Sequence, residues 1–285
     1  MRFHVSEAGP EDGRPVLALH GWPQHHYVYR DLLADPPPGL RIIAPDVGGG
    51  FGVRGEFYPE DFLIPFASHR LGQPVMWQED RREHMIATNH AREAECELEI
   101  ACNPHGRILG LRGQAWVNTG AYIRTTAASP PRNIAQVLSG PYRIENIQID
   151  VGLLVSNKAP SGTYRAPGRF EADFFRERLL DLVARDLGLD RVAFRRRNLI
   201  TEAEMPWPLA TVMPMKNSSQ CDSGNYQITL DRCLKEFDWP AKIKLEGKIF
   251  NGRYHGFAVG CYLEGTGSGK EWARLVLEDN GTVSV

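Results

Sequence analysis

A glycine-rich stretch near residue 50 constrains this chain more than any other feature. It reads Val47-Gly48-Gly49-Gly50-Phe51-Gly52. Because glycine has no Cβ, the backbone of such a loop can lie directly against a ligand. The sequence patterns before and after the loop differ, so we expect residues 1–46 to form a unit distinct from the remainder.

The composition is that of a soluble globular protein. With 285 residues, 42% apolar and 24% charged, the chain can bury the core of one large or two ordinary domains. A formal net charge of −2 gives no reason to expect nucleic acid or an anionic membrane as a partner. No apolar run approaches the roughly 18 residues of a membrane span. The first residues lack an apolar core, so no signal peptide is predicted and a cytoplasmic location is expected.

The cysteines and histidines predict no metal site. None of the five cysteines lies in a C-x-x-C pair, so neither a zinc ribbon nor a cysteine-ligated iron–sulfur cluster is indicated. We expect most of them to be small buried residues in a reducing compartment. His84 and His90 need not share a face, and we interpret them as ordinary polar residues.

The first 46 residues carry the pattern of one βαβ unit. Short apolar runs at Val16–Leu19 and Leu40–Ala44 predict two buried strands. The spacing of apolar residues in His25–Ala34 predicts a helix between them. Strand, polar loop, helix and strand in this order are typical of a βαβ unit in an α/β sheet.

Two short motifs in this segment, His20–Gln24 and Ile42–Asp46, resemble the start of α/β-hydrolases of the epoxide-hydrolase and dehalogenase type. The resemblance implies that the backbone N–H of Trp22 belongs to an oxyanion hole. Such hydrolases also need a nucleophile on a strand-to-helix elbow, usually G-x-S-x-G. The chain contains no such elbow, so we interpret residues 1–46 as a scaffold piece rather than as a hydrolase site.

The remainder predicts mixed sheets and helices, an α+β fold class. Apolar residues alternate with glutamates in Arg92–Ala101, and a turn at Asn103–Gly106 leads to a second run at Ile108–Val117, which predicts a hairpin. A strong amphipathic pattern predicts a helix over Glu171–Leu187 that ends at Gly188. The other predicted helices are Glu60–Leu71, a short helix capped by Asp190, and Asp231–Phe237, and the other predicted strands are Gln73–Gln78, Ile147–Val155, Arg253–Glu264 and Trp272–Glu278.

Two features of this part bear on packing. The apolar positions of the long helix form one stripe that we expect to face the core, namely Phe175, Leu179, Leu182, Val183 and Leu187. Three consecutive arginines, Arg195–Arg197, invite a phosphate-binding interpretation, but we expect them to form surface ion pairs.

A series of motifs in the remainder occurs in the order found in one enzyme family. Its members are Asp46–Gly52, Glu79–His84, Gly120–Tyr122, Gly140–Tyr142, Tyr164–Arg169 and Arg195–Ile200. The series is similar to the molybdopterin-binding large subunit of the molybdenum hydroxylases, which include xanthine dehydrogenase, aldehyde oxidase and carbon monoxide dehydrogenase. The likeness covers about residues 46–285, and the ordered set is far more specific than any single motif.

The resemblance implies a fold of mixed sheets with packed helices and a molybdopterin cofactor, with the cytosine dinucleotide form as one option. In such enzymes the pterin holds the molybdenum, with no direct protein ligand, and the cofactor hydroxylates a carbon with water-derived oxygen. Electrons leave through iron–sulfur and FAD modules, which the resemblance places on partner subunits. The expected substrate is a small molecule.

The resemblance also implies which residues surround the cofactor. Backbone N–H groups around Phe51 and Gly52 can donate to an oxo or pterin oxygen. Arg165 matches an arginine beside the molybdenum, where a fixed cation stabilises developing negative charge. The implied cofactor-binding set is Gly49, Gly50, Phe51, Gly52, Arg165 and Ala166. The implied substrate pocket contains Glu56, Pro167 and Glu264.

Departures from the family pattern narrow the expected substrate. Carbon monoxide dehydrogenases have a copper-binding cysteine after the arginine, where this chain has Ala166, so CO oxidation is not expected. Xanthine-type enzymes have Phe at the place of Pro167 and a substrate-binding Glu at the place of Gly55, with Glu56 next to it here. These differences argue against purine recognition. The expected substrates are aldehydes or N-heterocycles.

Two further motifs of the family have no counterpart in the sequence: a Gly-Gln-Gly loop and the Gly-x-Gly-Glu that supplies the catalytic base. General-base catalysis is worth about 10²–10⁴-fold, so the catalytic set is incomplete and we expect the chain to be inactive alone. We expect residues 47–205 to be a partial first molybdopterin-binding domain and 206–285 the start of a second. Two alternatives stay open: an α/β-hydrolase with an unusual remainder, and a chimeric reading frame without an evolved function.

Overall fold

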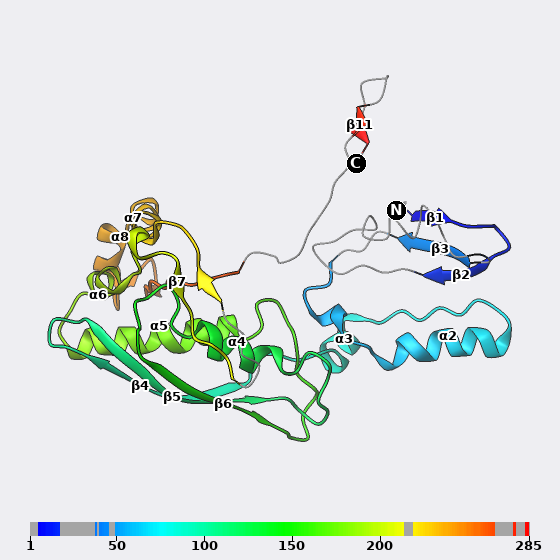
Figure 1. The fold of residues 1–285 in the computed structure, drawn as a ribbon, viewed down its shortest axis with the longest axis horizontal. Helices are drawn as coiled ribbons and strands as arrows, with labels where there is room; N and C mark the ends of the chain where they lie inside the picture. The colour runs from blue at the N-terminus through cyan, green and yellow to red at the C-terminus, as the bar shows by residue number, and fades with distance from the viewer. Residues whose placement is uncertain are drawn as a thin grey trace.

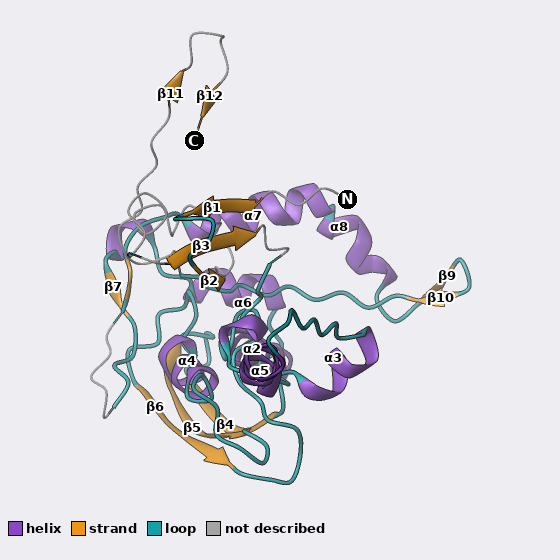
Figure 2. Cartoon of the chain, turned by 90° about the vertical axis from the view of Figure 1, so that its right-hand side faces the viewer, coloured by secondary structure: helices purple, strands orange, loops and turns teal. Residues whose placement is uncertain are grey.

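The computed structural model describes residues 5–17, 38, 40–45, 49–213, 219–265, 276–277 and 283–284. Its main body is a three-stranded sheet with two helices packed on one face (Figures 1 and 2). Within the described part, no helix is long and apolar enough to cross a membrane.

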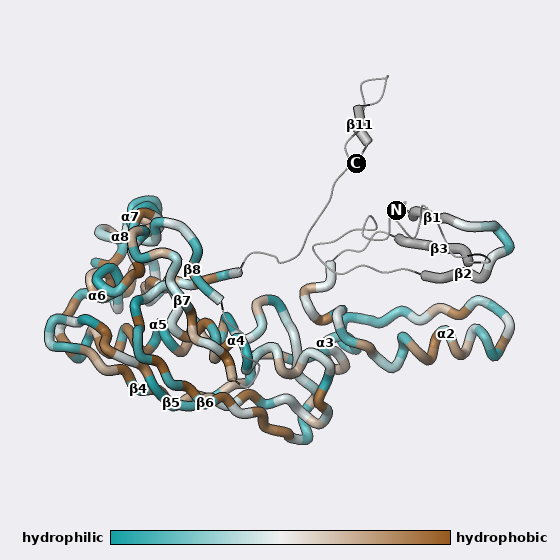
Figure 3. The backbone as a smooth tube through the Cα atoms, in the orientation of Figure 1, coloured by the Kyte–Doolittle hydropathy of each residue, from teal (hydrophilic) through white to brown (hydrophobic). Residues whose placement is uncertain are grey.

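The main sheet has the strand order β4-β5-β6, formed by β4 (Ala94–Cys102), β5 (Ile108–Asn118) and β6 (Ile147–Leu154). β4 and β5 run antiparallel, and β5 and β6 run parallel. Along β4, half-buried apolar residues alternate with exposed glutamates, because successive side chains of a strand point to opposite faces. The predicted hairpin and the strand predicted at 147–155 are therefore confirmed. Brown apolar stretches mark the three strands in Figure 3.

Two helices, α4 (Ser129–Val137) and α5 (Arg169–Asp186), pack on this sheet and on each other. α5 confirms the predicted long helix, and Gly188 follows it with φ +66°. The predicted apolar stripe is confirmed for Phe175, Leu179 and Val183, which are half-buried and pack against the core, and it is wrong for Leu187, which is exposed. α5 is covered by α4 and α6 as well as by the sheet, so its deepest stripe lies one position further round the helix. That stripe is Ala172, Arg176, Leu180 and Ala184.

A buried ion-pair cluster joins α5 to α6 (Arg191–Asn198). Arg195 is fully buried and donates to Glu177 Oε2 at 2.8 Å and to Asp181 Oδ1 at 2.7 Å. The prediction of surface ion pairs is therefore wrong for Arg195, because α5 supplies the carboxylates that a buried guanidinium needs. It is confirmed for Arg196, which forms an exposed ion pair.

The N-terminal residues that the structure describes form a second sheet. β1 (Val5–Ala8) pairs antiparallel with β3 (Leu40–Pro45), and β2 (Arg14–Leu17) pairs with β3 in parallel. The two predicted strands are thus confirmed. The helix predicted at 25–34 and the N–H of Trp22 lie outside the described residues.

The turn η2 (Val53–Gly55) and the helices α2 (Pro59–Leu71) and α3 (Arg81–Ala87) follow the glycine loop. α2 confirms the predicted helix. The strand predicted at 73–78 is wrong, because a strand needs a hydrogen-bonded neighbour and no described segment pairs with these residues. Met76, at its centre, is 85% exposed.

The part after residue 200 consists of short elements. Its helices are η3 (Glu202–Glu204), α7 (Tyr226–Phe237), α8 (Trp239–Lys242) and η4 (Ile243–Leu245). Its strands are β7 (Trp207–Pro208), β8 (Gln220–Cys221), β9 (Ile249–Phe250), β10 (Arg253–Tyr254), β11 (Val276–Leu277) and β12 (Val283–Ser284). α7 begins before the predicted Asp231, because Asn225 caps it by accepting from the Ile228 N–H at 3.1 Å. The strand predicted at 253–264 is wrong after β10, since residues 256–264 form no ladder.

Candidate functional site

Two loops that are far apart in sequence meet at the candidate site. The N–H of Arg165, in the loop 163–168, donates to the carbonyl oxygen of Phe51 at 2.9 Å. At Gly52 an added Cβ would lie 2.5 Å from Thr163 Cγ2 and 3.0 Å from the Thr163 carbonyl oxygen. Gly52 is therefore required by the close approach of the two loops. The structure thus brings the residues predicted at 49–52 together with Arg165 and its neighbour Ala166.

Each loop holds one non-glycine residue in the left-handed region. The φ angle is 53° at Phe51 and 58° at Ala166. Such conformations cost about 1–3 kcal/mol each, and they persist only where the surrounding structure fixes them. The contact between Phe51 and Arg165 supplies part of that constraint.

The loops present donors that no described residue satisfies. The N–H groups of Gly50 and Gly52 have no acceptor among the described residues, although Gly50 is buried. The exposed side chain of Arg165 likewise contacts no acceptor within this part of the chain. Backbone N–H groups in turns form concave sites that bind anionic oxygens, and a nearby cation strengthens such binding. An oxo or phosphate oxygen of a molybdopterin cofactor therefore fits this donor set.

The carboxylate of Glu56 is buried and accepts hydrogen bonds from other residues of the chain. It is 6% exposed and accepts from Thr125 Oγ1 at 2.6 Å and from the Thr126 N–H at 2.9 Å, as well as from Thr126 Oγ1. Burial raises the pKa of Glu56, but these hydrogen bonds outweigh burial and lower it below its ordinary value. Thr126 Oγ1 in turn accepts from the Thr163 N–H at 3.0 Å. Glu56 thus connects the glycine segment to the second loop, and its role in a substrate pocket stays a prediction.

The other two predicted pocket residues flank the start of α5. The carbonyl oxygen of Pro167 accepts from Asn133 Nδ2 at 2.8 Å. Glu264 forms an ion pair with Arg169, the first residue of α5, and its side chain is half exposed. Glu264 therefore lies near the second loop although 95 residues separate it from Arg169. The function predicted for both residues stays a prediction.

Two residues at the loops gave no signal in the sequence. Arg92 donates to the carbonyl oxygen of Arg165 and forms an ion pair with Glu171. Thr126 links Glu56 to the second loop, as described above. Their partners lie 73 and 37 residues away, so no local pattern could have revealed either contact.

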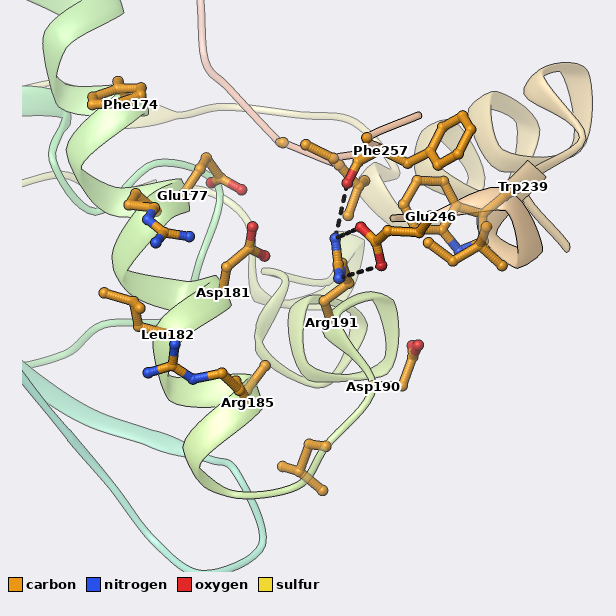
Figure 4. A pocket seen from close by; sticks show the side chains of 18 residues that line it. Phe174, Glu177, Asp181, Leu182, Arg185, Asp190, Arg191, Trp239, Glu246 and Phe257 are labelled. Atoms are coloured by element: carbon orange, nitrogen blue, oxygen red, sulfur yellow. Dashed lines mark hydrogen bonds and ion pairs between the residues drawn. The ribbon is translucent and has the colours of Figure 1, made fainter. Parts of the chain in front are cut away.

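A groove lies between α5 and residues 256–260 (Figure 4). Its volume is about 870 Å³. Arg191 donates to both carboxylate oxygens of Glu246, at 3.0 and 2.9 Å, and to the Phe257 carbonyl oxygen at 2.8 Å. The carboxylates of Glu177 and Asp181 on its α5 side already hold Arg195. None of the predicted site residues lines this groove.

Within the described part, no cluster of three or more His, Cys, Asp or Glu side chains could hold a metal ion. His84 lies 2.8 Å from Glu79, between Nδ1 and Oε2. The backbone of His90 forms a single parallel bridge with Ser161. The interpretation of both histidines as ordinary polar residues stays a prediction.

Comparison with known proteins identifies the class. The molybdopterin cofactor-binding domain family matches residues 16–199. The chain belongs to this family, and the resemblance inferred from the ordered motifs is confirmed at this level.

Individual relatives come from molybdenum hydroxylases. The chain is 33% identical to the 6-hydroxypseudooxynicotine dehydrogenase complex subunit gamma of Paenarthrobacter nicotinovorans, over 91% of this chain and 33% of that subunit. It is 31% identical to the nicotine 6-hydroxylase large subunit of the same organism, over 98% of this chain and 36% of the relative. The solved quinoline 2-oxidoreductase of Pseudomonas putida 86 is similar with a TM-score of 0.66 and 25% identity, over 85% of this chain and 33% of that one. The chain thus spans about a third of the length of these relatives.

The extent of these matches bears on the N-terminal segment. The family match begins at residue 16, inside the segment 1–46 that resembles α/β-hydrolases. The similarity to the nicotine 6-hydroxylase subunit spans 98% of the chain and so includes most of this segment. The predicted boundary after Asp46 therefore lies within the matched region, and the hydrolase resemblance stays a prediction.

Proposed function

We propose that this chain provides one side of the cofactor site in a molybdenum hydroxylase large subunit. The observation that carries the proposal is the contact of the loops 49–52 and 163–168, with N–H donors and an arginine that lack acceptors in the described structure. When bound, the cofactor supplies the redox chemistry that hydroxylates a carbon with water-derived oxygen.

The residues of this chain would bind and orient the cofactor. The N–H groups of Gly50 and Gly52 would donate to its anionic oxygens, and the Arg165 guanidinium would stabilise negative charge that develops during the reaction. Ala166 leaves the position after the arginine without a metal-binding side chain, so CO oxidation is not proposed.

The proposed substrates are N-heterocyclic aromatic compounds, with aldehydes as the second class. Two of the relatives are named for nicotine derivatives, and the solved neighbour is named for quinoline. Phe51, in the glycine loop, carries an exposed aromatic side chain. Flat aromatic faces of this kind favour stacking with a planar ring.

The rest of the enzyme is part of the proposal. The general base, the cytosine dinucleotide form of the cofactor, and iron–sulfur and FAD partner subunits would complete a cytoplasmic complex. One relative is named as a subunit of a dehydrogenase complex, which supports an assembly of several chains. By itself the chain is proposed to be inactive, with residues 47–205 and 206–285 as parts of two domains.

The alternative proposal is that the reading frame is chimeric. In that case residues 1–46 would derive from an α/β-hydrolase and the remainder from a molybdenum hydroxylase. The parallel pair of β2 and β3 is compatible with that origin, whereas the family match from residue 16 favours a continuous chain. Sequencing genomic DNA across Asp46–Val47 decides between them, since a junction that continuous reads do not support would show the chimera.

Molybdenum and pterin content tests the proposed function. The chain is purified from a host that makes the cofactor, together with Gly52→Val and the control Gly188→Ala. We expect bound molybdenum, at less than one atom per chain, in the wild-type chain and in Gly188→Ala, where no atom lies within 4 Å of the added Cβ. Gly52→Val should lose it, because its side chain would push the loops apart. A wild-type chain without molybdenum, or equal loading of Gly52→Val, would contradict the proposal.

A further inference from the structure

We infer that Arg92 is a positioning residue that fixes the second loop, and with it Arg165, against the glycine loop. The inference rests on the proposed function, because it assigns Arg92 a task at the same cofactor site. It concerns a side chain that no sequence motif singled out.

The guanidinium of Arg92 donates hydrogen bonds to three acceptors within residues 165–171. It donates to the carbonyl oxygen of Arg165, to that of Ala166 at 3.5 Å, and to Glu171 Oε2 at 3.3 Å. Its planar group carries five N–H donors on three nitrogens in fixed directions, whereas a lysine has three donors on a single nitrogen. The carbonyls of the loop and the first turn of α5 are therefore tied to one point.

Two aromatic rings complete the environment of Arg92. Its Cζ lies 4.5 Å from the ring centroid of Phe170 and 5.2 Å from that of Tyr164. A guanidinium over aromatic faces within about 6 Å is attracted by the ring quadrupoles. Tyr164 and Phe170 flank the segment that carries Arg165, so the same cation holds both ends of the loop.

The backbone at both ends of this contact is in the left-handed region. The φ angle of Arg92 is 76° and that of Ala166 is 58°. Side chains disfavour these values, and surrounding contacts must maintain them. Because the Arg165 N–H also donates to Phe51, a shift of Ala166 would move the glycine loop as well.

The experiment compares the full chain with Arg92→Met, Arg92→Lys and the matched control Arg196→Met. Arg196 also forms an ion pair, with Asp231, but it lies on α6 rather than at a loop. Arg92→Lys keeps the positive charge opposite Glu171 and removes the planar set of donors.

Amide hydrogen exchange of the cofactor-free chain is the first readout. Arg92→Met should speed exchange of the hydrogen-bonded amides of both loops about tenfold, the effect of losing one charge-assisted hydrogen bond. These amides are Arg54, Gly55, Thr163 and Arg165. Exchange in the strands β4–β6 should not change. Unchanged exchange in the loops, or the same rise in Arg196→Met, would overturn the inference. If Arg92→Met fails to fold, Arg92→Lys takes its place and should show a smaller rise confined to the same residues.

Molybdenum content and the electron paramagnetic resonance signal of the reduced, loaded chain are the second readout. Arg92→Met should hold less molybdenum and shift the signal of the metal that remains, and Arg92→Lys should restore only part of both. Reduced loading with an unshifted signal would show a merely structural role and overturn the positioning role. If the wild-type chain takes up no molybdenum, the proposed function fails, while the exchange readout still decides the task of Arg92.

Discussion

Glycines with positive φ serve two distinct purposes at the scale of single residues. At Gly168, the N-cap of α5, an added Cβ would lie 2.0 Å from the carbonyl oxygen of Pro130. At Gly188, after α5, it would meet no atom within 4 Å. The φ angles of Gly168 and Gly188 are similar, +73° and +66°. A comparison of substitutions at these two glycines therefore separates the cost of the backbone conformation from the cost of close packing.

Alanine substitution at these two glycines should therefore have unequal effects. Gly188→Ala should lower the free energy of unfolding by roughly 1–2 kcal/mol, the cost of a left-handed side chain. Gly168→Ala should lose a further 1–3 kcal/mol, approximately the cost of overpacking, because a backbone carbonyl cannot move aside freely. Urea denaturation measures both. Equal losses would contradict the close contact of the second loop with α4.

The environment of Glu56 predicts that the protein loses folding stability at acid pH. Burial raises its pKa, but hydrogen bonds from Thr125 and Thr126 outweigh burial, and the pKa lies below the ordinary 4.5. A carboxylate with a lowered pKa in the folded state stabilises the protein above its unfolded pKa. That contribution is lost as the pH falls below about 4.5 and through the folded pKa.

Glu56→Gln should remove the contribution of Glu56 to the pH dependence of the free energy of unfolding. At pH 7 it should lower the free energy of unfolding by about 1–3 kcal/mol, because the threonine donors lose a charged acceptor. The difference in stability between pH 7 and about pH 3 should shrink relative to the wild type. Glu99→Gln is the control, since its pair with Arg112 is exposed. Wild-type acid sensitivity in Glu56→Gln would show that the carboxylate has no special environment.

Contacts between elements depend on the buried arginines of α5 and α6. Arg176 donates to Asp173 at 2.6 Å and to the carbonyl oxygen of Cys261 at 2.7 Å, so it also ties the 261 segment to α5. Burial lowers the pKa of Arg195, but Glu177 and other groups raise it above its ordinary value, and the side chain stays charged. The cluster is therefore a network of paired charges.

Arg195→Met should be strongly destabilising. It leaves the carboxylates of Glu177 and Asp181 without their cation, which typically costs about 3–5 kcal/mol. Arg196→Met, next in sequence, removes only an exposed pair and should change stability by less than about 1 kcal/mol. Thermal and urea unfolding of the two variants measure the contrast. Similar losses in both would argue that the cluster does not join α5 and α6.

The elements that were predicted correctly are those whose sequence pattern lies within one continuous segment. The β4–β5 hairpin and α5 have periodicities that one segment contains entirely. The strand predicted at 73–78 and the part of the predicted strand 253–264 that follows β10 were wrong, because an alternating pattern forms a strand only beside a partner. The burial of Arg195 could not be predicted, since its carboxylates come from another helix.

In the candidate site, too, residues within a sequence motif could be predicted and residues from distant segments could not. Gly49–Gly52, Arg165 and Ala166 are predictable because they belong to motifs, and the structure places them together. Arg92 and Thr126 are not, because each contacts the second loop from a distant segment. The partners of Glu56 also come from outside its motif, and they show why a glutamate near the glycine loop can serve the protein itself.

At the scale of the whole molecule, the two loops of the proposed cofactor site form an open surface contact, and we propose that they supply one side of the site. The loops 49–52 and 163–168 meet beside α4 and α5, which rest on the β4–β6 sheet (Figure 1). The groove of about 870 Å³ lies elsewhere, along the other part of α5 (Figure 4). We therefore propose that the cofactor binds at the loops and not in that groove.

Anomalous diffraction at the molybdenum edge, from crystals of the cofactor-loaded chain, tests this assignment most directly. We expect one molybdenum peak beside residues 49–52 and 163–168, with cofactor oxygens facing the Gly50 and Gly52 N–H groups and Arg165. A peak in the groove along α5, or loaded crystals with no peak at the two loops, would contradict it.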